Sequence, residues 1–321
     1  MNKRGVYFTV LAISFVTILY LLYTFKLPQE QREASFVYET RILTMNDLLL
    51  DIQDDAGRML QVATFRAIVA MEDVIANNGT YVSNVSNGFQ TLVMNATLEG
   101  VNQSAMENNT YPLWASRMVA QASAIGVTLA MSPGPFAIEQ LSPWTVTGRT
   151  NLTIYIADAL LNASWNVTRQ VNGTIELEAF EDPVYRLGTS GRVTNLVRQT
   201  PITDFVSGTN VNNLMAHANE SYYRAWTGAP SFLQRLEGKL TNSSPYGIES
   251  LVNLQELSDA GLFTSTKSVV DYIYFSSNNP SSCTVNGTPS WFRMDGSWNA
   301  ELTQRHPHFY EVEGLINGCL S

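Results

Sequence analysis

Residues 6–25 read VYFTVLAISFVTILYLLYTF, and this stretch decides how the rest of the chain is interpreted. It contains no charged residue, and a helix of this length rises about 30 Å, the thickness of the hydrocarbon core of a bilayer. Lys3 and Arg4 precede it, and positive charge favours the cytoplasmic side of a membrane. The sequence therefore predicts one transmembrane helix, with residues 1–5 in the cytoplasm and the rest of the chain outside the cell.

A cleavable secretory signal is the alternative to a permanent span. Its apolar core usually has about 7–15 residues and is followed by a small-residue cleavage site. Here the apolar run is longer, and residues 26–30, KLPQE, offer no such site. An uncleaved span is therefore favoured, with the lipid bilayer as its partner.

The composition fits an exported protein with a polar, weakly charged surface. The chain has 321 residues, of which 45% are hydrophobic and only 15% are charged, with a formal net charge of -9. The hydrophobic share is large enough for a core of one large domain or two modest ones. An acidic chain without a basic cluster argues against nucleic acid as a partner.

Sequons for N-glycosylation are frequent after the apolar segment. Chance predicts roughly four to five in a chain of this composition. The sequence has twelve, at Asn78, Asn84, Asn95, Asn102, Asn108, Asn151, Asn162, Asn166, Asn172, Asn219, Asn242 and Asn286. All twelve lie on the side assigned to the exterior, which agrees with the orientation predicted from Lys3 and Arg4. The alternative is an Asn-rich polar surface whose sequons are not used.

The two cysteines, Cys283 and Cys319, form an even pair in a chain expected outside the cell. Such a pair predicts one disulfide, which would tie the last residues to the domain. Two free buried thiols, or half of a metal site, are the alternatives.

A long stalk helix is predicted over residues 34–76, after a break at Pro28. Apolar residues within it step alternately by three and four, which forms a coiled-coil-like seam over about three heptads. The seam consists of Ile42, Met45, Leu49, Ile52, Ala56, Met59 and Ala63. Two interpretations remain open: self-association through this seam, or packing of an amphipathic helix on its own head domain.

The remainder predicts an α+β ectodomain in two regions. Residues 78–182 form a glycosylated α+β region, with a helix at 113–125 and a strand at 152–156. A hairpin is expected between 166–171 and 174–180, because Asn172-Gly173 suits a type I′ turn and would place Arg169 opposite Glu176. Residues 183–321 form a C-terminal α+β region closed by the disulfide, with helices expected at 231–238 and 248–260.

No motif in the sequence indicates catalysis or a bound cofactor. His306-Pro307-His308 offers two imidazoles to a metal, but a solvated loop is the favoured interpretation. Glu181-Asp182 stands before a proline and is interpreted as a turn. We therefore expect a non-enzymatic protein without cofactors.

The start of the chain resembles a known signal. Lys3-Arg4-Gly5 stands directly before the apolar helix, and this arrangement is similar to the class III signal of archaeal type IV pilin-like proteins. In that family a membrane peptidase cuts after the small residue, and the apolar helix then packs subunits into a filament or anchors a monomer. The resemblance implies cleavage between Gly5 and Val6.

Other segments resemble uncharacterised archaeal pilin-like surface proteins. They are RILTM at 41–45, FEDP at 180–183 and ESLVNLQEL at 249–257. The resemblance implies a structural or adhesive surface role on an archaeal cell. An extracytoplasmic ligand-binding or sensing domain that works with a separate membrane partner is the alternative.

Overall fold

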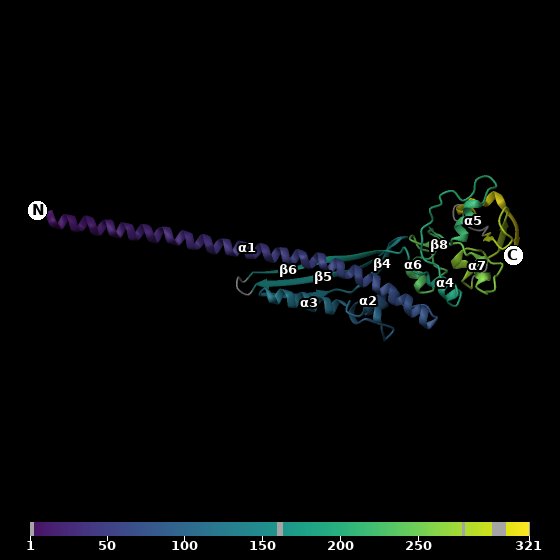
Figure 1. Ribbon diagram of the computed structural model, residues 1–321, viewed down its shortest axis with the longest axis horizontal. Helices are drawn as coiled ribbons and strands as arrows, with labels where there is room; N and C mark the ends of the chain where they lie inside the picture. The colour runs from purple at the N-terminus through teal and green to yellow at the C-terminus, as the bar shows by residue number, and fades with distance from the viewer. Residues whose placement is uncertain (1–2, 159–162, 278–279, 297–305, 321) are drawn as a thin grey trace. The chain divides into compact units, whose positions relative to one another are not determined.

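The computed structural model describes residues 3–158, 163–277, 280–296 and 306–320 (Figure 1). The fold is mixed α+β, with an apolar N-terminal helix and several antiparallel sheets. The chain divides into two compact units. The first comprises Met1–Asp55, Met118–Ser132 and Thr153–Thr168, and the second comprises Ala56–Arg117, Pro133–Leu152 and Arg169–Ser321.

One helix, α1 (Lys3–Asn78), contains both the predicted span and the predicted stalk. The break expected at Pro28 is wrong, because the helix continues through it. A proline inside a helix removes one backbone hydrogen bond and bends the axis, and a helix of 76 residues retains enough bonds on either side. The helix ends at Asn78, close to the predicted end at residue 76, because Gly79 adopts a φ of 67° and donates its N–H to the carbonyl of Ile75.

The seam of α1 is mostly buried in the folded chain. Met45, Leu49, Ile52, Ala56 and Ala63 are each at most 5% exposed, and Ile42 is 44% exposed. The buried stripe continues at Leu60, Ala67 and Ala70. This arrangement matches the interpretation of an amphipathic helix that packs on its own domain, and it leaves little of the seam free for a second chain.

In the first unit, Arg41 links α1 to the C-terminal end of strand β5 (Thr145–Asp158). This unit holds the C-terminal part of α3 (Tyr111–Ala124) and most of β3 (Val127–Pro133). Arg41 pairs with Asp158 of β5 and donates to the carbonyl of Ile125 at 2.7 Å. The helix predicted at 113–125 and the strand predicted at 152–156 are confirmed.

The main sheet has the order β3-β5-β4, with β6 (Ala163–Glu176) also paired to β5. The strand β4 (Ala137–Ser142) runs antiparallel to β5. Only residues 159–162 separate β5 from β6, so these two strands form a hairpin. The predicted hairpin turn at Asn172-Gly173 is therefore wrong, because both residues, together with Arg169 and Glu176, lie within β6.

Close packing of β6 against α1 explains why residue 173 is a glycine. A Cβ on Gly173 would lie 2.6 Å from the Cα of Gln61, and a Cβ on Gly148 in β5 would lie 2.9 Å from a ring carbon of Phe89. Glycine inside a strand marks a close approach of backbones as well as a turn. In the second unit, Gly173 therefore allows β6 to contact the backbone of α1 directly.

The second unit also contains many short elements. The first group is α2 (Val85–Asn95), β1 (Thr97–Leu98), β2 (Val101–Asn102) and a 3-10 turn at Ser104–Met106. The helices that follow are α4 (Pro183–Gly188), α5 (Asn212–Asn219), α6 (Phe232–Leu236), α7 (Leu254–Asp259), α8 (Asp271–Tyr274) and α9 (His306–Phe309). The strands are β7 (Tyr223–Ala225), β8 (Ile248–Ser250), β9 (Ser282–Val285), β10 (Arg293–Asp295) and β11 (Ile316–Leu320), with a 3-10 turn at Glu313–Leu315.

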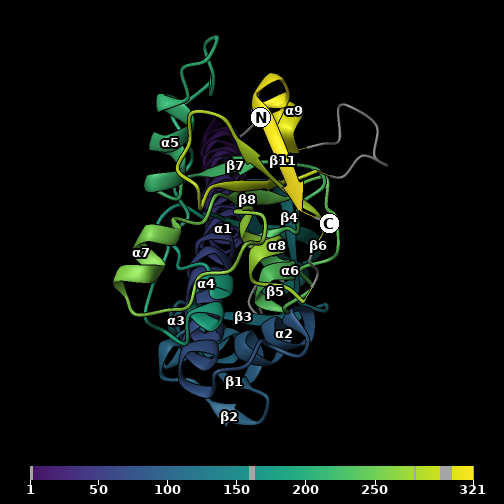
Figure 2. The same ribbon diagram turned by 90° about the vertical axis from the view of Figure 1, so that its right-hand side faces the viewer.

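The C-terminal elements surround one apolar core, to which α4, α5, α7, α8, β9 and β10 contribute buried side chains. Figure 2 shows these elements grouped together, with β1 and β2 at the opposite end of the view. Phe205, Leu251, Phe292 and Tyr310 are fully buried in it. The strands form two antiparallel sheets, β7-β8 and β10-β9-β11. The helix predicted at 231–238 is confirmed as α6, whereas 248–260 begins with strand β8 and becomes helical only at Leu254.

Side-chain caps explain where the short helices begin. Ser231 and Gln234 form a reciprocal capping box at α6, and Asn253 accepts hydrogen bonds from Gln255 and Glu256 at α7. Asp182 caps α4 with Pro183 at its first turn, so the Glu181-Asp182 turn is also a helix start.

Candidate functional site

The N-terminal part of α1 is an exposed apolar surface. Residues Val6–Thr24 have a mean hydropathy of 2.1, and this part of the helix is long and apolar enough to cross a membrane. Every large apolar side chain between Val6 and Tyr23 is at least 50% exposed. An apolar surface of this extent marks a site that contacts lipid or another protein.

Serine and threonine side chains in this segment form hydrogen bonds with the backbone of their own helix. Ser14 donates to the carbonyl of Val10 at 2.9 Å, Thr17 to that of Ile13 at 2.7 Å and Thr24 to that of Tyr20 at 2.9 Å. These bonds within the helix pair the hydroxyls of the three residues, as the hydrocarbon interior of a bilayer requires. Ser14, Thr17 and Thr24 are therefore compatible with immersion in lipid.

The sequon asparagines lie at the surface. Asn162 falls outside the described residues, and the other eleven sequon asparagines are all exposed. By contrast, Asn195, which is not in a sequon, is 6% exposed and donates to the carbonyl of Ser221 at 3.0 Å. The fold therefore leaves each described sequon asparagine accessible for modification.

A buried ionic cluster centres on Arg235 of α6. Its guanidinium contacts the carboxylates of Asp182 and Asp271, and all three side chains are 0% exposed. It also donates to the carbonyl of Ile248 at 3.2 Å, while Ser250 donates its hydroxyl to Asp271 at 2.9 Å. Burial raises the pKa of Asp271 to about 6, although Arg235 opposes that shift.

A second buried cluster surrounds His306 of α9. Its Nδ1 lies 2.9 Å from Asp295 and its Nε2 lies 3.1 Å from Glu249. Burial by itself lowers the pKa of His306, but the two carboxylates raise that pKa well above its usual value. His306 therefore carries a positive charge between two acids. The prediction of a solvated loop is wrong, because His306–Phe309 forms helix α9 and His306 is 6% exposed. Only the exposure of His308 agrees with it.

Neither cluster is placed like a reaction centre. A catalytic group needs to reach a substrate, whereas these side chains are enclosed by protein. Among the described residues, no group of three or more His, Cys, Asp and Glu side chains is placed to hold a metal ion. No local sequence pattern indicates the cluster at Arg235, because its partners lie 53 and 36 positions away.

The carboxyl group of Glu72 in α1 is largely buried. One of its carboxylate oxygens and one of Glu181 are buried without a hydrogen-bond partner. Burial, and then the charge of Glu181, raise the pKa of Glu72 to about 9. Glu72 is therefore protonated at neutral pH.

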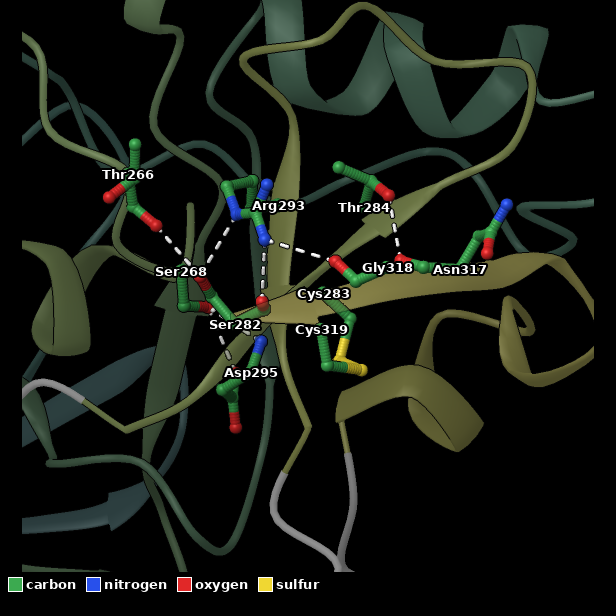
Figure 3. Close-up of a disulfide and its surroundings, with 10 residues drawn as sticks. All are labelled: Thr266, Ser268, Ser282, Cys283, Thr284, Arg293, Asp295, Asn317, Gly318 and Cys319. Carbon is green, nitrogen blue, oxygen red and sulfur yellow. Dashed lines mark hydrogen bonds between the residues drawn. A yellow bond between two sulfur atoms is a disulfide. The ribbon is translucent and has the colours of Figure 1, made fainter. Parts of the chain in front are cut away.

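The disulfide joins Cys283 of β9 to Cys319 of β11 (Figure 3). Beside it, Arg293 donates to the carbonyl of Ser282 at 2.7 Å and to that of Gly318 at 3.2 Å. Thr284 adds a bond to the carbonyl of Asn317 at 2.7 Å. The C-terminal strand is therefore held by covalent and polar contacts together.

Clefts open on the described surface of the second unit, and the lining of three of them is defined. The first, about 640 Å³, lies between α2 and residues 133–136, and a neighbouring cleft of about 390 Å³ lies between α2 and residues 97–100. The third, about 460 Å³, is lined by Arg198, Asn219 and Glu256 among others. No protein-family model, curated protein or solved structure matches the chain.

Proposed function

We propose that this protein is a membrane-anchored, N-glycosylated, non-enzymatic surface protein with a pilin-like structural or adhesive role. The observation that carries the proposal is the exposed apolar part of α1, in which Ser14 and Thr17 donate their hydroxyls to backbone carbonyls of the same helix. A surface of this kind is stable only when lipid or apolar protein covers it.

Three further features support an exterior location for the rest of the chain. The eleven described sequon asparagines are exposed. The two cysteines are joined as a disulfide, which persists in oxidising compartments. Lys3 and Arg4 precede the apolar segment, and such charges favour the cytoplasmic side.

Cleavage between Gly5 and Val6 follows from the resemblance to class III signals. The mature protein would then begin with the apolar segment itself. Self-association through the seam of α1 is less well supported, because five of its seven residues are buried in the folded chain. Assembly of subunits would instead use the exposed apolar segment within or above the bilayer.

Deletion of residues 6–25 tests the anchoring role. The full-length chain should pellet with membranes and resist extraction at high pH, whereas the deleted chain should be released in folded, soluble form. Release of the full-length chain by high pH would contradict anchoring. Recovery of the deleted chain in the membrane fraction would show that another surface holds it there.

A ligand-binding or sensing role is the second candidate, and the clefts are the observation that favours it. The cleft of about 640 Å³ has a volume in the range of small-molecule sites. Its lining contains amide and hydroxyl groups but no charged side chain and no Trp or Arg, so it offers no charged group to orient an ionic ligand.

A further inference from the structure

Each of the three clefts includes a sequon asparagine in its lining. Asn84 lines both the cleft of about 640 Å³ and the cleft of about 390 Å³, and Asn219 lines the third. Asn84 therefore lies at the boundary between two clefts beside α2. The other sequon asparagines that the structure describes do not contribute to these three clefts.

The side chain of Asn84 is fixed in orientation. Its Oδ1 accepts the N–H of Asn87 at 2.8 Å, which caps the start of α2. N-glycosylation attaches sugar to Nδ2 and leaves Oδ1 free to accept this bond. A glycan on Asn84 would thus start from a side chain already held by the helix cap.

The lining suits a sugar. The larger cleft presents the amides of Asn87 and Gln90, the hydroxyl of Ser86 and the apolar surface of Met94 and residues 133–136. The smaller cleft adds the hydroxyls of Ser83, Thr91 and Thr97. Amides and hydroxyls exchange hydrogen bonds with sugar hydroxyls, while apolar edges cover the hydrogen-bearing faces of a pyranose ring.

We propose that the N-linked glycan of Asn84 folds back into these clefts, so that its first sugars are an integral part of the protein surface between α2 and residues 133–136. This inference rests on the proposed glycosylation. It distinguishes Asn84 from sequons such as Asn286, which follows strand β9, is exposed and lines none of the three clefts.

Site-resolved deglycosylation of the folded protein tests the proposal. The full-length chain is produced in a secretory host whose N-glycans begin with N-acetylglucosamine, and glycopeptide mass spectrometry first measures occupancy at each sequon. Peptide N-glycosidase then acts on the native protein over time. One net hydrogen bond between sugar and cleft slows release about fivefold to tenfold, so Asn84 should lose its glycan at least that much more slowly than Asn286.

The denatured protein and one variant serve as controls. After denaturation the two sites should be released at similar rates. Asn87→Ala removes an amide from both clefts but keeps the backbone N–H that caps α2, so release at Asn84 should accelerate and release at Asn286 should not change. Circular dichroism of the variant checks that the helix is retained.

The outcomes separate this inference from the proposed function. Equal release rates at Asn84 and Asn286 in the folded protein would overturn the inference, as would protection that Asn87→Ala leaves unchanged. An unmodified Asn84 beside occupied sequons would also overturn it and leave the glycosylated surface protein intact. If no sequon carried a glycan, the glycosylation on which both rest would be refuted.

Discussion

Arg235 illustrates how single residues hold the second unit together. It pairs with Asp182 and Asp271, and all three side chains are fully buried. Asp182 also accepts a hydrogen bond from the hydroxyl of Tyr223. Asp182 caps α4 and Asp271 begins α8, so the guanidinium of Arg235 in α6 links the starts of two other helices. Removal of the cation would leave two buried carboxylates without a counter-charge.

We therefore predict that Arg235→Leu lowers the free energy of unfolding by roughly 3–5 kcal/mol, the usual cost of breaking a buried ion pair. Arg149→Leu is the matched control. Arg149 pairs with Glu139 at the surface, where both side chains are more than a quarter exposed, so its loss should cost less than about 1 kcal/mol. Urea unfolding in mild detergent, followed by Trp fluorescence, measures both. Equal costs would mean that the buried cluster contributes no special stability.

Glu72 predicts a pH dependence whose sign follows from its pKa. The folded protein keeps the proton up to about pH 9, whereas the unfolded chain releases it near its ordinary pKa of 4.5. The burial of Glu72 therefore reduces stability increasingly as pH rises from 4.5 to about 9. Glu72→Gln replaces the ionisable carboxyl group with an uncharged amide of nearly the same shape.

The expected result is that Glu72→Gln unfolds at a higher temperature than the wild type at pH 8, with little difference at pH 4.5. Thermal unfolding at a series of pH values provides the measurement. Glu107→Gln, at an exposed position, should show no such trend. A Glu72→Gln variant that is less stable at pH 8 would show that the carboxylate is stabilised where it lies.

At the scale of elements, the contact between β6 and α1 depends on Gly173. A Cβ at this position would collide with the backbone at Leu60 and Gln61, and backbone cannot rotate away as a side chain can. Gly173→Ala should therefore destabilise the protein by about 1–3 kcal/mol, the usual cost of overpacking.

Gly314→Ala is the matched control for this substitution. Gly314 has no heavy atom within 4 Å of an added Cβ, so its replacement should leave the urea midpoint nearly unchanged. If Gly173→Ala also left the urea midpoint unchanged, β6 and α1 would not be in direct backbone contact at this residue.

The elements also show which local patterns are reliable. The start of α6 follows from Ser231 and Gln234, and the end of α1 follows from Gly79, because both signals act within one helical turn. The Asn172-Gly173 pair misled the hairpin prediction because a glycine in an extended segment serves a turn and a close backbone approach equally well. Only the position of α1, which lies more than a hundred residues earlier in the chain, distinguishes the two uses.

The C-terminal strand β11 gives a prediction about the disulfide. Cys283 and Cys319 lie 36 positions apart, and a cross-link that closes a loop of this size stabilises a fold by roughly 3–4 kcal/mol in the chain-entropy model. The double variant Cys283→Ser/Cys319→Ser should lose stability of this order in urea unfolding. An unchanged midpoint would show that the polar contacts of Arg293 suffice to hold β11.

For the whole molecule, the sequence predicts features that depend on one continuous segment. The apolar segment and the sequons could be found because each depends on a few consecutive residues. The clusters around Arg235 and His306 could not, because their members come from distant positions and meet only through the packing of the second unit. The same holds for the clefts at Asn84, whose walls belong to α2 and to residues 133–136 and 97–100.

The central claim is that the chain is anchored by residues 6–25 and that the rest lies outside the cell. Intact mass measurement with N-terminal sequencing, on protein purified from its native membrane, tests this claim most directly. The account predicts a chain that has lost residues 1–5, begins at Val6 and carries several glycan masses. A chain that retains residues 1–5 and carries no glycan would contradict both the pilin-like processing and the exterior location.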